Sequence, residues 1–291
     1  MTKERRAAVE MLLCALMWSL GALLLKLIPW HPFAVSGIRS LIAGGVLLVY
    51  MRLTKTKLLL SKKTVALSLV VAAIFVCYVP AARMTNSANA VVLQYTAPVY
   101  VLAFGALRYK RRPQLGDALV GLFTIVGVAL FFFDQLAAGS FLGNMLALAS
   151  GIFLAAIFFI GGGVTERERF SGLFLGQMVS MVIGLPFVFT KPMLINTDTV
   201  LCILTLGVVQ LGIPYILYVR ASRHCRPFAC SLLSVIEPLL SPIWIYVAIG
   251  EAPGMMALYG SIVVLVSVTV WSVWQSKKDT APQAQDDPIN G

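Results

Sequence analysis

The sequence contains few charged residues, few histidines and none of the short motifs that mark the common enzyme classes. Only 12% of its 291 residues are charged, and two are histidine. A soluble domain carries about 25% charged residues, so this composition excludes an ordinary soluble globular protein. No HExxH, GxSxG or GxxxxGK[ST] sequence is present, which argues against zinc-protease, serine-hydrolase and nucleotide-driven chemistry. We therefore expect that the protein is not an enzyme.

The cysteines lack the arrangement of a disulfide framework or a metal site. They are scattered, odd in number and without a CxxC pair: Cys14, Cys77, Cys202, Cys225 and Cys230. Four of them lie in apolar stretches, where cysteine behaves as a small hydrophobic residue. We predict no structural disulfide, no metal cluster and no bound cofactor.

Apolar sequence is abundant, in runs of the length that crosses a membrane. Hydrophobic residues make up 59% of the chain, and the mean hydropathy is +0.89. A bilayer core about 30 Å thick requires about 20 apolar residues in a helix. The sequence predicts an all-α polytopic membrane protein in a lipid bilayer, with ten transmembrane helices over residues 7–28, 32–50, 64–82, 88–107, 115–133, 143–163, 171–190, 199–219, 227–247 and 256–274.

Basic residues concentrate in alternate connections between these spans. Of 23 Lys and Arg, 19 lie in the segments assigned to one side, three lie opposite (Lys26, Arg83 and Lys191), and Arg39 lies within a span. This asymmetry is the positive-inside signature, and it predicts a multi-pass protein of the plasma membrane with both termini in the cytoplasm. The net charge of +11 then follows from membrane topology, and we expect no nucleic-acid partner.

An internal repeat joins the two halves of the chain. Pro98 aligns with Pro238, and Pro113 with Pro253, at a constant offset of 140 residues. We predict one five-helix repeat over residues 1–138, a second over 139–276, and a disordered cytoplasmic tail over 277–291. Because five is odd, the repeats have opposite orientations, as in many secondary transporters, although a duplicated bundle without transport is an alternative.

Several passages of the two halves together form a recognisable pattern. They are Trp18-Ser19, Arg39, ANAVVLQYTAPVYVL over 88–102, GNMLALASG over 143–151, LLSVIEPLLSPIW over 232–244, and Gly250-Glu251. Over residues 7–275 the chain resembles the EamA-type members of the drug/metabolite transporter superfamily. The resemblance implies two inverted repeats around a central cavity, and transport of small organic metabolites, often amino acids and frequently outward. Where many relatives carry a Gly-Glu turn, the first half has Tyr109-Lys110-Arg111, so we assign Glu251 no role in transport.

Two charged residues lie deep inside predicted spans. Glu237 is about ten residues into the span 227–247, and Arg39 is seven residues past Pro32. A charge at the bilayer centre costs about 2.5–3.5 kcal/mol, so such residues usually face a cavity or a partner. Glu237 binds substrate or a proton, or else it is a protonated carboxyl hydrogen-bonded inside the bundle. Arg39 binds substrate, snorkels to the outer face or contacts a carbonyl of a broken helix.

Paired prolines indicate where a binding site would lie. Pro98 and Pro238 interrupt equivalent spans and free the carbonyls of Gln94 and Ser234, one turn earlier. Freed carbonyls at membrane depth need side chains, water or ligand, and paired interruptions point to a midplane site. The predicted substrate-binding residues are Trp18, Ser19, Arg39, Gln94, Tyr95, Ser231, Ser234 and Glu237. Tyr78, Gln177, Gln210 and Tyr215 also lie inside spans, where an aromatic side chain more often fills the core than binds a ligand.

Together these features predict a secondary-active or facilitative transporter that works by alternating access. One cation, one carboxyl, amides and aromatics suit a zwitterionic small molecule such as an amino acid, and Glu237 is the proton-coupling candidate. A translocator of a lipid or lipid-linked intermediate would share this architecture and stays as the alternative. The GxxxG spacing of Gly172 and Gly176 is weakly compatible with a homodimer.

Overall fold

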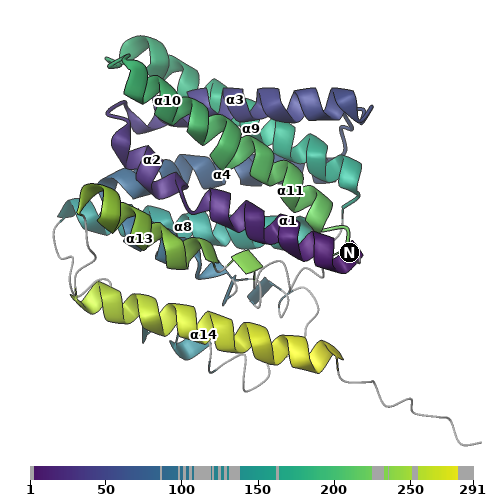
Figure 1. Ribbon diagram of the computed structural model, residues 1–291, viewed down its shortest axis with the longest axis vertical. Helices are drawn as coiled ribbons and strands as arrows, with labels where there is room; N and C mark the ends of the chain where they lie inside the picture. The colour runs from purple at the N-terminus through teal and green to yellow at the C-terminus, as the bar shows by residue number, and fades with distance from the viewer. Residues whose placement is uncertain are drawn as a thin grey trace, which may run out of the picture.

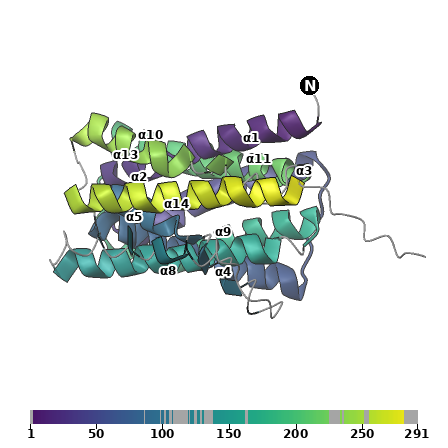
Figure 2. The same ribbon diagram turned by 90° about the horizontal axis from the view of Figure 1, so that it is seen from below.

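The described part of the chain is entirely helical. A computed structural model describes residues 3–85, 87–97, 99–100, 103–104, 107, 119, 121–123, 126–127, 130, 138–161, 164–224, 233–234, 236–250 and 255–280. Every regular element in these ranges is a helix, and the helices run roughly alongside one another in both views (Figure 1 and Figure 2). Five are long and apolar enough to cross a membrane: Arg5–Leu27, Pro32–Leu53, Lys62–Met84, Glu166–Thr190 and Thr197–Ala221. The all-helical class is therefore confirmed for the described residues, and the length and composition of these five helices fit the predicted membrane protein.

The count of ten spans stays a prediction. Shorter apolar helices cover Phe141–Ile157, Ile236–Ile249 and Leu258–Ser267, in line with three further predicted spans. Most of the predicted spans 88–107 and 115–133 lies outside the described residues. The last helix continues to Thr280, through the start of the segment predicted as a tail, and residues 281–291 also lie outside the described part.

Short local signals set the starts of the helices. The first half contains α1 (Lys3–Trp18), α2 (Gly21–Leu27), α3 (Pro32–Leu53), α4 (Lys62–Met84) and α5 (Ser87–Gln94). Pro32 at the first position suits a helix start because its φ is already helical, and the His31 side chain accepts a 3.3 Å hydrogen bond from the Phe33 N–H. Ser61 caps α4 by accepting a 3.1 Å hydrogen bond from the Thr64 N–H.

The second half has the same kind of helix boundaries. It contains α8 (Ala138–Gly161), α9 (Glu166–Thr190), α10 (Thr197–Thr205), η1 (Leu206–Gly212), α11 (Ile213–Ala221), α13 (Ile236–Ile249) and α14 (Met255–Thr280). Thr165 and Glu168 form a capping box at the start of α9, which satisfies backbone donors that the first turn leaves free. The N-terminal end of α1 and the C-terminal end of α14 lie at the same end of the bundle (Figures 1 and 2).

Glycines bring the central helices into close contact. A Cβ atom added at Gly184 in α9 would lie 2.5 Å from the Cα atom of Gly37 in α3, so the two backbones touch. Gly172 and Gly176 of the GxxxG sequence face α4, where an added Cβ would meet Leu67 at 2.6 Å and Val71 at 2.6 Å respectively. This stripe is therefore covered by α4 of the same chain, and it gives no support for a homodimer.

Three spans contain irregular backbone. The first is broken at Ser19 and Leu20, between α1 and α2, and α5 ends at Gln94 in a turn at Tyr95 and Thr96. The span Thr197–Ala221 contains the π-helical segment η1, whose i to i−5 pattern continues in the bond from Ile213 N–H to Val208 C=O. At membrane depth such backbone is tolerated only where protein or a water-filled cavity satisfies it. Irregular segments of this kind often mark functional sites.

Candidate functional site

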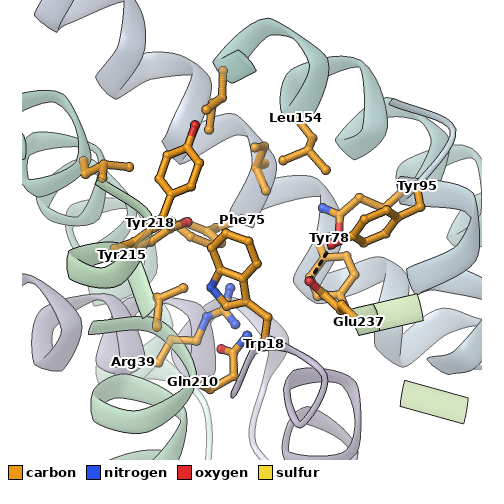
Figure 3. A pocket seen from close by; sticks show the side chains of 15 residues that line it. Trp18, Arg39, Phe75, Tyr78, Tyr95, Leu154, Gln210, Tyr215, Tyr218 and Glu237 are labelled. Carbon is orange, nitrogen blue, oxygen red and sulfur yellow. Dashed lines mark hydrogen bonds between the residues drawn. The ribbon is translucent and has the colours of Figure 1, made fainter. Parts of the chain in front are cut away.

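A cavity lies among the helices where these irregular segments meet. The centres of water molecules can occupy about 80 Å³ of this cavity, and one water molecule requires roughly 10–15 Å³ measured in the same way. The space therefore has room for several water molecules. The side chains that line it come from both halves of the chain (Figure 3): Trp18, Arg39, Ile74, Phe75, Tyr78, Gln94, Tyr95, Leu154, Ile157, Leu173, Gln210, Leu211, Tyr215, Tyr218 and Glu237.

The breaks in the helices deliver several of these side chains. Trp18 is the last residue of α1, Gln94 is the last residue of α5, and Tyr95 lies in the turn that follows. Gln210 lies in η1, and its side chain packs against the start of α2, since a Cβ atom added at Gly21 would be 2.7 Å from its Nε2. The break in the first span thus lies directly against the π-helical segment of the second half.

A hydrogen bond joins the two halves across the cavity. The Tyr95 hydroxyl donates to Oε2 of Glu237 over 2.8 Å, as the dashed line in Figure 3 shows. Tyr95 follows α5 and is 7% exposed, and Glu237 lies in the first turn of α13. Hydrogen bonds to a charged carboxylate are among the stronger ones in proteins. Glu237 is also the only carboxylate among the described residues that line the cavity.

Arg39 lines the cavity and has no acidic partner among the residues that the structure describes. Its side chain is 1% exposed, and Cζ lies 4.6 Å from the centre of the Phe75 ring. Within the described residues, its Nε and Nη2 atoms have no hydrogen-bond partner. Removing a charge from water costs several kcal/mol, and a desolvated cation–π contact offsets about 2 kcal/mol of that cost. In the described structure, the Nε and Nη2 atoms of the guanidinium therefore stay available for a further partner.

Aromatic rings form much of the remaining wall. Trp18 packs against Tyr215 in an edge-on arrangement with a centroid distance of 6.1 Å, and against Tyr218 at 6.1 Å. Tyr78 and Phe75 of α4 complete this wall. Figure 3 shows Trp18 between the Arg39 and Gln210 side and the Tyr95 and Glu237 side. The cavity thus presents a cation and a carboxylate separated by aromatic surface.

The structure brings together five of the residues that the sequence marked for the site. Trp18, Arg39, Gln94, Tyr95 and Glu237 all line the one cavity. Whether these residues bind substrate stays a prediction.

Three further candidates are buried nearby without lining the cavity. The Ser19 hydroxyl donates to the Leu16 carbonyl over 2.7 Å and accepts a 2.9 Å hydrogen bond from Nε1 of Trp244. Ser234 and Pro238 are buried at the start of the α13 region. The remaining candidates, Ser231 and Pro98, lie outside the described residues.

Three of the side chains expected to fill the core are buried and also border the cavity. Tyr78, Gln210 and Tyr215 line the cavity, although their sequence context does not distinguish them from core residues. Gln177 does not line it, and both atoms of its amide are buried without a partner in the described structure. As for metals, no group of three or more His, Cys, Asp or Glu in the described residues could hold an ion.

Comparisons with known proteins agree with the arrangement. The sequence model of the EamA-like transporter family matches residues 5–133 and 141–273. A protein of Archaeoglobus fulgidus named as an uncharacterized transporter is 25% identical over 200 residues, which cover 66% of this chain and 70% of that protein. The transporter YdfC of Bacillus subtilis is 25% identical over 194 residues, covering 64% of this chain and 62% of its own length.

A solved structure shares the fold. One crystal structure of a protein superposes on this chain with a TM-score of 0.68, and the superposition covers 94% of this chain and 98% of that one. Its sequence identity is 17%, so the likeness concerns the fold alone. The family and the names of the relatives indicate an integral membrane transporter rather than an enzyme. Because the family model matches most of its length in two segments, the chain belongs to the EamA-like transporter family.

Proposed function

We propose that the protein is a secondary-active or facilitative transporter of small organic metabolites, with amino acids or related compounds as substrates and export as the direction. The observation that carries the proposal is the cavity, because both family-matched segments line it. Trp18, Arg39 and Tyr95 come from the segment 5–133, and Gln210 and Glu237 come from the segment 141–273. Sites between two repeats are where transporters of inverted topology bind substrate.

Alternating access supplies the mechanism. Two five-helix repeats, over 1–138 and 139–276, would rock against each other and open the cavity first to one side of the membrane and then to the other. The Tyr95 to Glu237 hydrogen bond spans the two repeats, so a substrate or proton that competes for Glu237 changes how the halves are held together. The basic connections favour a plasma-membrane orientation with both termini in the cytoplasm.

The chemistry of the cavity favours a small zwitterion. A phosphorylated substrate would call for several cations at depth, whereas Arg39 is the one Lys or Arg among the described residues that line the cavity. A guanidinium, a carboxylate, two amides and several aromatic rings together suit a molecule with one charge of each sign and an apolar part. Amino acids have this composition.

Glu237 is the group that we propose for proton coupling. One charge that moves through 100 mV is worth about 2.3 kcal/mol, enough for a substrate gradient of roughly fifty-fold. A partly buried carboxyl that is held by a tyrosine hydroxyl and lines the cavity can take up a proton on one side and release it on the other. Without this coupling, the same site would support facilitated diffusion.

Counterflow in proteoliposomes tests the proposal. Vesicles loaded with an unlabelled amino acid should accumulate the same labelled amino acid, and Glu237→Gln should abolish this exchange. Asp198→Asn is the matched control, because Asp198 is an exposed carboxylate at the start of α10, and it should keep the full rate. Vesicles that scramble a fluorescent lipid but exchange none of the amino acids, amines or nucleosides offered would show the lipid translocator instead.

A further inference from the structure

The two free nitrogens of Arg39 lie on the same edge of its guanidinium group. Nε and Nη2 are the pair that project side by side, away from the Nη1 atom, and neither has a partner in the described structure. Two parallel N–H donors at this spacing match the two oxygens of a carboxylate, which is how arginine binds carboxylates in a bidentate manner. The free edge is therefore a fork of fixed geometry and not only a positive charge.

An arginine at the end of a neighbouring helix shows how a structural arginine is satisfied. Arg83, near the end of α4, donates from Nη1 to the carbonyls of Leu25 (3.0 Å) and Ile28. These contacts tie α4 to the end of the broken first span. Arg39 is more deeply buried than Arg83, yet its Nε to Nη2 edge makes no such bond among the described residues. A purely structural role for Arg39 leaves that edge unexplained.

Acceptors for a second group of the substrate line the same cavity as Arg39. Oε1 of Gln210 is buried without a partner in the described structure. The η1 segment that carries it packs on α3, because a Cβ atom added at Gly207 would lie 3.2 Å from the Arg39 carbonyl oxygen. Glu237 lines the opposite part of the cavity (Figure 3), and no ion pair between Arg39 and Glu237 occurs in the described structure. The fork is thus not occupied by the cavity's own carboxylate.

We propose that the Nε to Nη2 edge of Arg39 binds the carboxylate of the transported molecule, so that the protein selects free carboxylates over the corresponding amides, amines and esters. The inference rests on the proposed function and makes its substrate class narrower. A substrate that lacks the carboxylate leaves the fork buried and unpaired, which penalises binding as well as removing an attraction. Gln210 then accepts a hydrogen bond from a donor on the same molecule.

The test compares acids with their amides on purified wild-type protein. The panel contains the twenty standard L-amino acids and, for each, the 2-oxo acid, the primary amide and the decarboxylated amine. Each compound is titrated in a thermal-shift assay up to on the order of 10 mM, because KM values seldom exceed about 1 mM. We expect that every compound that binds has a free carboxylate, and that its amide binds roughly 10- to 100-fold more weakly. This comparison needs no variant, so it does not depend on any variant folding.

Variants of Arg39 then identify the residue responsible. In Arg39→Gln the ratio of acid to amide affinity should fall to about one, and Arg39→Lys, which keeps the charge but not the fork, should give an intermediate ratio. Arg52→Gln is the matched control, because Arg52 is an exposed arginine near the end of the same helix, and its ratio should equal that of the wild type. If Arg39 had only a structural role, Arg39→Gln would lower the melting temperature without changing the ratio of acid to amide affinity.

Three results would overturn the assignment: amides or amines that bind as tightly as the acids, an unchanged ratio in a folded Arg39→Gln protein, or no binding by any acid of the panel. Each is distinguishable from failure of the proposed function. Transport of an amine or a nucleoside in proteoliposomes would leave the protein a transporter and remove only the carboxylate site. Acids that bind through Arg39 but never exchange across the vesicle membrane would keep the site and remove the transport function.

Discussion

The contact between Gly37 and Gly184 predicts how the protein responds to a single added methyl group. A Cβ atom at position 184 would lie 2.5 Å from both the Gly37 Cα and the Phe33 carbonyl oxygen. Van der Waals contact between such atoms begins at about 3.5 Å, so Gly184→Ala must separate α3 from α9 by roughly 1 Å. Overpacking of this kind costs about 1–3 kcal/mol. An alanine in place of glycine inside a helix gains only about 0.5–1 kcal/mol.

The assay is thermal unfolding of the purified protein in detergent, followed by tryptophan fluorescence. A net loss of about 1–2 kcal/mol should lower the midpoint by roughly 2–8 °C in a chain of this size. Because Arg39 lies two residues beyond Gly37 on α3, the variant should also weaken substrate binding.

Gly45→Ala provides the matched control for this prediction. Gly45 lies on α3, eight residues beyond Gly37, and a Cβ atom there meets nothing within 4 Å. This variant should gain the helix propensity of alanine without any clash, so its midpoint should rise. If Gly184→Ala is as stable as Gly45→Ala, the two backbones are not in contact and the packing argument is refuted.

Three further outcomes follow from contacts near the cavity and the helix ends. Tyr95→Phe removes the hydroxyl that donates to Glu237 and should slow counterflow by about tenfold or more, so a wild-type rate would contradict the role of that bond. Burial, together with two nearby cations, lowers the pKa of His31. The imidazole is therefore protonated at a higher pH in the unfolded chain than in the folded protein, and the free energy of unfolding falls on acidification below about pH 6.5. His31→Asn, which keeps a capping side chain, should show a smaller drop in melting temperature between about pH 7.5 and about pH 5.5, and an equal drop would assign the effect elsewhere. Glu10→Gln breaks the 2.6 Å ion pair with Arg220 and should cost about 1 kcal/mol, while Arg220→Gln on top of it should add little because both changes remove the same pair.

The parts of the fold that follow from chemistry along one stretch of chain were predictable. The predicted span 32–50 corresponds to α3 (Pro32–Leu53), because a proline marks its start and basic residues follow its end. Arg39 and Glu237 were identifiable as cavity residues because an intramembrane charge is costly wherever it faces lipid. Both line the cavity.

Other parts depend on contacts between distant segments, which one sequence does not reveal. Gln210 lines the cavity because η1 packs against the break in the first span, and nothing near position 210 in sequence indicates this. The break at Ser19 contains no proline, so the usual signal for an interrupted helix was missing. The aromatic wall is hard to predict for a similar reason, since a tyrosine inside a bundle looks the same in sequence whether it borders packed core or open space.

The contact of α3 with α9 also limits which parts of the bundle can move. Each forms the second predicted span of its own family-matched segment, and at Gly37 and Gly184 no side chain lies between the two backbones. Sliding there would disrupt a close-packed contact that has no compressible layer. In Figure 1 α3 lies near one edge with α9 beside it, whereas α14 lies at the opposite edge and α13 lies between them, level with α8. We therefore expect α3 and α9 to serve as the pivot of the transport cycle, with the larger displacements on the side of α13, where two side-chain hydrogen bonds, from Tyr95 to Glu237 and from Trp244 to Ser19, bridge the two segments.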